Sequence, residues 1–138
     1  MSVPNSIRRA AVVLTATSAL GLIVAPNAHA NWSSYIASWG QGEESRRWAD
    51  ESYSQLQFTG CTVEHGSNNV TVAYYRDVPL STDPKEDSKT FTACFGSGTS
   101  NGEWTGLASG DWYFRAESIG GGGLLNVTTV SVDTTQAD

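Results

Sequence analysis

The sequence predicts an all-β fold, a small β-sandwich with one disulfide. Segments beyond residue 53 are short, alternate apolar with polar residues, and are separated by turns rich in Gly, Ser and Asn. Nothing between residues 54 and 138 keeps a 3.6-residue period, which argues against helices. Two cysteines, Cys61 and Cys94, are an even number in a chain that we expect to be exported, which predicts one disulfide.

Residues 1–30 have the pattern of a secretory signal peptide. Arg8 and Arg9 precede an apolar run over residues 10–24, and Ala28-His29-Ala30 offers a cleavage site. The apolar run is about 15 residues, shorter than the roughly 20 that span a bilayer. We expect a secreted, extracellular chain that begins at Asn31 and leaves by the general secretory route, with the twin-arginine route as the alternative.

The charge balance excludes several function classes. The chain has 14 acidic and 8 basic residues, and loss of Arg8 and Arg9 would bring the net charge from −6 to about −8. Polyanion binding needs clustered Lys and Arg, so we expect no nucleic acid and no membrane as a partner. After cleavage, His65 is the remaining histidine, which makes a zinc site or a histidine-dependent triad improbable. We expect no catalysis, no metal and no cofactor.

Residues 31–52 form an N-terminal aromatic arm. Trp32, Tyr35, Ile36 and Trp39 recur at the spacing of one helix face, and Gly40 would end such a helix. Two helical turns are not stable alone in water, so the apolar face needs a cover. Two interpretations stay open. The arm packs on its own sandwich, as a first strand, or it docks in a groove of another protein.

The charged segment over residues 43–51 places a basic pair and a tryptophan between acidic residues. It is either a solvated hinge with weak ion pairs or a rim at which Arg46 or Arg47 contacts a partner. Together with the arm it gives one candidate partner-binding site, made of Trp32, Tyr35, Ile36, Trp39, Arg46, Arg47 and Trp48.

The β-sandwich domain is expected over residues 53–138. Predicted strands cover residues 55–63, 70–76, 89–95, a short segment around Trp104, 112–119 and 124–132. A loop over residues 78–88 and a flexible four-glycine link at 120–123 join some of them. In the last strand we expect Leu124, Val130 and Val132 on one face and Leu125 and Val127 on the other. In residues 89–95 we expect Phe91, Ala93 and Phe95 opposite Cys94.

The string from Leu107 to Tyr113 has the form L-x-x-G-x-x-Y. It resembles the tyrosine corner of immunoglobulin-like and fibronectin-type sandwiches, in which the hydroxyl bonds to backbone a few residues upstream. The expected sandwich is then immunoglobulin- or fibronectin-like, with Tyr113 as a structural corner; otherwise Tyr113 is a strand aromatic.

Three further functions stay open. The loop around Pro79-Leu80 could enter a protease cleft, as inhibitors do. Asp83, Glu86 and Asp87 could hold calcium, although their spacing matches no calcium loop. Trp104 and Trp112, if exposed, could stack on sugars in a carbohydrate-binding module.

Several motifs point to a family. They are Ser45-Arg46-Arg47-Trp48-Ala49-Asp50, Phe58-Thr59-Gly60-Cys61, Tyr75-Arg76-Asp77-Val78, Trp104-Thr105-Gly106-Leu107 and Gly110-Asp111-Trp112-Tyr113-Phe114. With the signal peptide, they resemble small secreted proteins of actinobacteria, and within that group the strap subunits of umbrella toxin particles. The resemblance implies a non-catalytic adaptor whose N-terminal arm inserts in a lectin-like subunit while its body holds the large toxin subunit.

Overall fold

The computed structural model describes residues 31–135, so the predicted signal peptide lies outside the described residues. The strands are β1 (Trp32–Trp39), β2 (Trp48–Glu64), β3 (Val70–Asp77), β4 (Lys85–Phe91), β5 (Thr99–Ile119) and β6 (Leu124–Asp133), with short 3-10 turns at η2 (Ala93–Phe95) and η3 (Gly120–Gly122). The predicted all-β class is confirmed. Between residues 31 and 135, no helix is long and apolar enough to cross a membrane.

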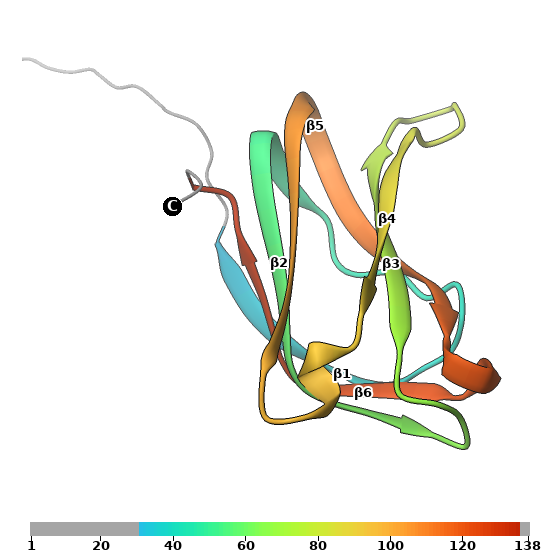
Figure 1. Cartoon of the computed structure of the whole chain (residues 1–138). Coiled ribbons are helices and arrows are strands. Elements are labelled where there is room, and N and C mark those ends of the chain that lie inside the picture. Colours follow the sequence, from blue (N-terminus) through green and yellow to red (C-terminus); the bar gives the residue numbers. More distant parts are fainter. Residues whose placement is uncertain (1–30, 136–138) are drawn as a thin grey trace, which may run out of the picture.

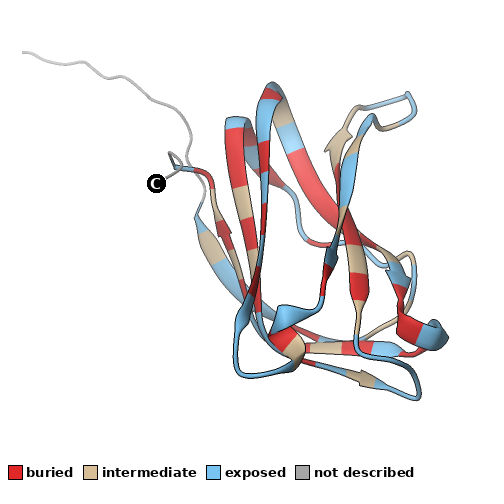
Figure 2. Ribbon diagram, in the orientation of Figure 1, coloured by how far each residue is buried: buried red, intermediate tan, exposed pale blue. Residues whose placement is uncertain are grey.

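All six strands belong to one antiparallel sheet with the order β1-β6-β2-β5-β3-β4. The sheet folds over itself (Figure 1). Two strands separate β1 from β5 in this order, yet the rings of Trp32 and Trp39 in β1 lie 6.4 and 5.7 Å from the ring of Phe114 in β5. The sandwich is therefore made by a continuous sheet. Buried positions occur along its strands (Figure 2), and their apolar side chains form one core cluster.

Two irregular points allow the long strands to bend. The pairing of β2 with β5 shifts around Ser52, where Ser52 and Gly106 have φ values of 70° and 66°. A β-bulge of this kind bends a strand and increases its twist. Gly60, with a φ of 71°, is the second point. A Cβ there would lie 2.5 Å from Thr128 Oγ1 on β6, so only glycine fits.

The prediction that β6 divides its apolar residues between two faces is wrong. Leu125, Val127, Val130 and Val132 are all buried, and Leu124 is exposed. The buried positions change from odd to even numbers at Thr128, opposite Gly60. They change at the same point in β2, where Leu56 and Phe58 precede Cys61. At this point both strands turn a different face towards the core, so the alternation of buried and exposed residues does not continue across the bend.

The prediction of a helix over Trp32 to Trp39 is also wrong, because this segment is strand β1. It pairs with β6 from Trp32 opposite Val132 to Trp39 opposite Leu125. Two turns of helix would gain little alone, whereas pairing with β6 satisfies the backbone and buries Ile36. Of the two open interpretations, the first-strand interpretation matches the structure, and the expected boundary after residue 52 falls inside β2.

Three other expectations change. Residues 89–95 are the end of β4 and the turn η2, so Ala93 is exposed while both Phe91 and Cys94 are buried. The loop after β3 is shorter than expected and covers residues 78–84. The segments around Trp104 and Trp112 form one continuous strand, β5, which their intervening glycines do not interrupt.

The predicted disulfide is confirmed. Cys61 in β2 is bonded to Cys94 in η2, with their Cα atoms 5.2 Å apart and a sequence separation of 33. Both cysteines are buried beside the core. The bond anchors the connection between β4 and β5 to the middle of the sheet.

Replacing Cys61 and Cys94 together by serine should lower the free energy of unfolding by about 3 to 4 kcal/mol, because the cross-link restricts the unfolded chain. Guanidinium denaturation measures this. The exposed neighbours Thr62→Ser and Thr92→Ser serve as the matched control. A loss below about 1 kcal/mol would contradict the expected role of the bond.

Candidate functional site

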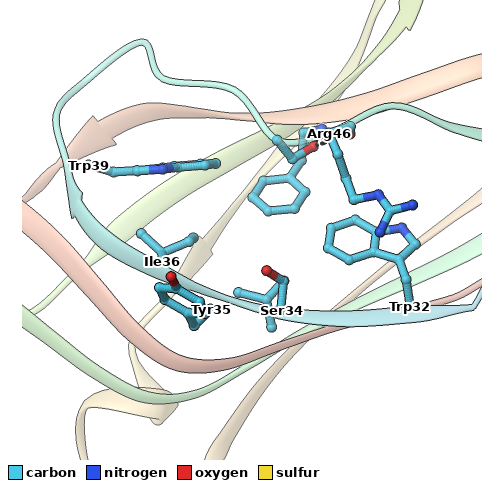
Figure 3. A pocket seen from close by; sticks show the side chains of 9 residues that line it. Trp32, Ser34, Tyr35, Ile36, Trp39 and Arg46 are labelled. Carbon is cyan, nitrogen blue, oxygen red and sulfur yellow. Dashed lines mark hydrogen bonds between the residues drawn. The ribbon is translucent and has the colours of Figure 1, made fainter.

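A pocket lies between β1 and the segment over residues 40–47 that returns to β2 (Figure 3). Its volume is about 110 Å³. The lining residues are Trp32, Ser34, Tyr35, Ile36, Trp39, Ser45, Arg46, Phe114 and Val130. A cavity of roughly 150 Å³ holds benzene, so this pocket suits an aliphatic side chain of about the size of valine or leucine.

The floor of the pocket is apolar and rigid. Ile36, Phe114 and Val130 are buried, and they come from three different strands. Trp32 stacks on Phe114 with an interplanar angle of 6°, and Trp39 contacts the same ring at 40°. The two half-buried tryptophans therefore stand at the ends of the pocket, held by a ring of the core.

Backbone hydrogen bonds fix the far wall. Gly42 N–H donates to Ala116 O (2.8 Å), Ala116 N–H donates to Glu43 O (3.0 Å), and Ser45 N–H donates to Phe114 O (2.9 Å). Ser45 Oγ also accepts a bond from the N–H of Phe114 (2.9 Å). These bonds hold the segment before β2 along the edge of β5, so Arg46 is placed opposite β1.

The two adjacent arginines have different surroundings. The Arg47 side chain is bonded to Glu44 Oε1 (3.1 Å), Asp77 Oδ2 (3.1 Å) and the carbonyl of Ser45 (3.2 Å), and it covers the Tyr113 ring at 3.7 Å. The Arg46 guanidinium lies 5.1 Å from the centre of the Trp32 ring. Within residues 31–135 it has no hydrogen-bond or ion-pair partner. The Arg46 guanidinium is therefore exposed, with its donors accessible at the rim of the pocket.

Trp32 contributes a second unused donor. Its Nε1 atom is buried and has no hydrogen-bond partner within the described residues. A buried N–H without an acceptor is costly, and native proteins rarely leave one. Trp48 and Trp112 differ, since their Nε1 atoms donate to Asp50 Oδ2 (2.9 Å) and Ala108 O (3.0 Å).

The pocket brings together five of the seven predicted partner-binding residues. Trp32, Trp39 and Arg46 form its rim, Tyr35 is 70% exposed beside it, and Ile36 belongs to its floor. Trp48 is a core residue whose ring lies 5.5 Å from that of Trp32. Arg47 faces the outer cluster described below.

Sequence reasoning did not find Phe114, Val130, Ser34 or Ser45. Phe114 and Val130 look like ordinary strand residues in the sequence. Their role here arises because the sheet folds over, which places β5 and β6 against β1. No local pattern carries this information.

Tyr113 is not a tyrosine corner of the expected kind. Its hydroxyl donates to Asp83 Oδ2 (2.6 Å), 30 residues upstream, and not to nearby backbone. Asp83 Oδ1 accepts from Val78 N–H (2.9 Å), and Arg76 N–H donates to Pro84 O (3.0 Å). Tyr113 therefore braces the loop between β3 and β4. The side chain that bonds to backbone four residues upstream is that of the neighbouring Trp112.

Other polar groups surround Tyr113 on the outer face of the sheet. Tyr75 stacks on it with ring centres 5.4 Å apart and donates to Glu117 Oε2 (2.7 Å). Lys85 Nζ lies 2.8 Å from Glu117 Oε1. Partial burial acts against ionisation of Glu117, but the bonds from Lys85 and Tyr75 prevail and lower its pKa. The bonds from Tyr113 and Val78 likewise lower the pKa of Asp83.

The remaining candidate sites receive no geometric support. Trp104 and Trp112 are buried at 2% and 1% exposure, so neither can stack on a sugar. Among residues 31–135, no group of three or more His, Cys, Asp or Glu residues could hold a metal ion. In the suggested calcium set, Asp83 is bonded to Tyr113 and Val78.

Compared with known protein families and with curated proteins, the chain matches none.

Stability should fall in acid partly through the bond between Tyr113 and Asp83. The folded pKa of Asp83 is lowered, so its contribution is present above the unfolded value of about 4 and is lost as the pH falls through the folded value. Urea midpoints measured from about pH 5 to pH 2 should decline less steeply in Asp83→Asn and in Tyr113→Phe. The double variant should resemble Asp83→Asn, because without the Asp83 carboxylate the loss of the Tyr113 hydroxyl removes nothing further from this titration; additive effects would contradict the shared bond.

Proposed function

We propose that this chain is a secreted, non-catalytic adaptor that binds other secreted proteins at the pocket between Trp32 and Trp39. The observation that carries the proposal is the pairing of an apolar pocket with two unused donors, Trp32 Nε1 and the Arg46 guanidinium, beside the exposed Tyr35. Tryptophan, tyrosine and arginine are the residue types most enriched among interface anchors.

The chemistry of the pocket favours binding over catalysis. Its lining has no carboxylate, histidine or thiol. The hydroxyls of Ser34, Tyr35 and Ser45 also line it, but a hydroxyl nucleophile is weak without an adjacent base to activate it, and no such base lines the pocket. Both cysteines are in the disulfide.

The resemblance to strap subunits gives the partners a class. It supports an extracellular toxin complex in which this chain links a lectin-like subunit to a large toxin subunit. A disulfide is typical of an oxidising compartment, which fits secretion. The proposed contact differs from a free inserted arm, because β1 is part of the folded sheet.

Point variants test the proposal better than removal of the N-terminus. Deleting residues 31–40 would remove strand β1, including the buried Ile36, so loss of binding would report unfolding. We expect Tyr35→Ser and Arg46→Gln each to reduce capture of co-secreted chains by about thirtyfold, which corresponds to a hot-spot contribution of about 2 kcal/mol. Affinity purification from culture supernatant with quantitative mass spectrometry measures this.

Leu80→Ser is the matched control. Leu80 is also a fully exposed large apolar residue, but it lies on the loop between β3 and β4, outside the pocket. Capture should be unchanged in this variant. If Tyr35→Ser and Arg46→Gln capture the same chains as wild type, the adaptor proposal fails.

Protease inhibition is a second candidate, favoured by the braced loop over residues 78–84. Asp83 holds this loop to Val78 and Tyr113, and Leu80 is fully exposed at its tip. Leu80 has a φ of 60°, whereas peptides that pair with a protein edge are extended, so the loop is not shaped like a substrate.

Incubation with subtilisin-type and trypsin-type proteases separates the two candidates. The adaptor proposal predicts full residual protease activity at equimolar protein. Inhibition that is lost in Leu80→Ser would instead favour the inhibitor function.

A further inference from the structure

The two edges of the sheet have opposite chemistry. β4 is one edge, and it has two lysines and two acids in seven residues. β1 is the other edge, and its sequence WSSYIASW contains no charged residue. Natural proteins commonly protect edge strands with charges, especially lysine. The β4 edge is protected in this way and the β1 edge is not.

The pocket runs along this unprotected edge. Ser34, Tyr35 and Ile36 are consecutive residues, and all three line it. Successive side chains of a strand point to opposite faces, so consecutive lining residues place a pocket beside the backbone of the strand. Arg46 and Trp32 both line this pocket; within the described residues the Arg46 guanidinium has no hydrogen-bond partner, and Trp32 Nε1 is buried without one.

From these observations we infer that an extended segment of the partner adds to the β1 edge as a seventh strand, places an aliphatic side chain between Trp32 and Trp39, and binds Arg46 and Trp32 Nε1 through a carboxylate. The inference rests on the proposed function and names its binding mode. Backbone hydrogen bonds to β1 supply affinity, while the pocket and the two donors supply specificity.

The dimensions fit a short segment. Residues 32–37 of β1, which precede the positive φ of Ser38, extend about 20 Å at the usual rise of a strand, so about six partner residues would cover this part of the edge. The Arg46 guanidinium already lies over the Trp32 ring, so a carboxylate that attracts it would open the way to the indole N–H below.

A second copy of this chain is the obvious competing occupant. An antiparallel pair of β1 strands would place Trp32 opposite Trp39 of the other copy, and the sequence is nearly symmetric. However, β1 has no carboxylate to offer to Arg46. A partner with an acidic extended segment satisfies both donors and needs no symmetry.

Panning a phage library of random octapeptides on the purified secreted protein tests the inference. We expect enriched peptides to combine an acidic residue with Val, Leu or Ile, without proline between them. Their affinity, measured by fluorescence polarisation, should fall at least tenfold for Arg46→Gln, the size expected for a charged hydrogen bond. Arg76→Gln, an arginine in β3 outside the pocket, should change affinity less than about twofold.

Backbone methylation identifies strand addition. Two versions of the tightest peptide are made, each N-methylated at alternate residues, in opposite phases. Since alternate N–H groups of a strand point to opposite sides, one version should lose binding at least tenfold and the other should retain it within about threefold. Equal behaviour of the two versions, no enrichment of acidic peptides, or a concentration-dependent dimer that Ser34→Lys abolishes would each overturn the inference.

Failure of the binding mode is distinguishable from failure of the function. Suppose that Tyr35→Ser and Arg46→Gln reduce capture of co-secreted chains while the two methylated peptides bind alike. The adaptor function is then supported, and strand addition is contradicted. If neither substitution affects capture, the proposed adaptor function is contradicted.

Discussion

The structure depends on the packing of Trp32 and Trp39 against Phe114. These contacts join β1, at one edge of the sheet, to the C-terminal third of β5, and so close the folded sheet over its core. Phe114 also lies 5.7 Å from Phe58 and 6.5 Å from Trp48, which places it at the centre of the aromatic core. Aromatic pairs at such separations stabilise the fold beyond the burial of their area. Here they hold two parts of one sheet face to face, as two separate sheets face each other in other sandwiches.

The same contacts create the proposed binding surface. Because both tryptophans are held by one core ring, they stand apart and leave a pocket between them whose rim is half exposed. Arg46 is fixed opposite by the hydrogen bonds that tie residues 42–45 to β5. The neighbouring Arg47 is used to hold the outer cluster around Tyr113. The two adjacent arginines therefore differ: Arg47 has a structural role, whereas Arg46 is exposed and has no hydrogen-bond partner within the described residues.

Composition and alternation were sufficient for the fold class, the disulfide and the buried faces of β3 and the first half of β2. They failed at two places where the chain departs from regular alternation. At Gly60, two paired strands change the face that they bury. In β1, the aromatic residues have helical spacing although the backbone is extended. In both places long-range pairing decides the structure, and local patterns cannot report it. The aromatic arm was found as the candidate site from residue types alone, but the floor residues and the difference between Arg46 and Arg47 required the folded sheet.

The central claim is that Phe114 forms the floor of this pocket and that a partner binds in it. The indole N–H of Trp32 reports on this claim most directly. Its resonance can be followed in nitrogen-labelled protein as the partner captured from culture supernatant is added. The account predicts a large change for the Trp32 indole signal, as an acceptor reaches it, and a constant signal for Trp112, which is already bonded to Ala108. An unchanged Trp32 signal in a saturated complex would contradict the account.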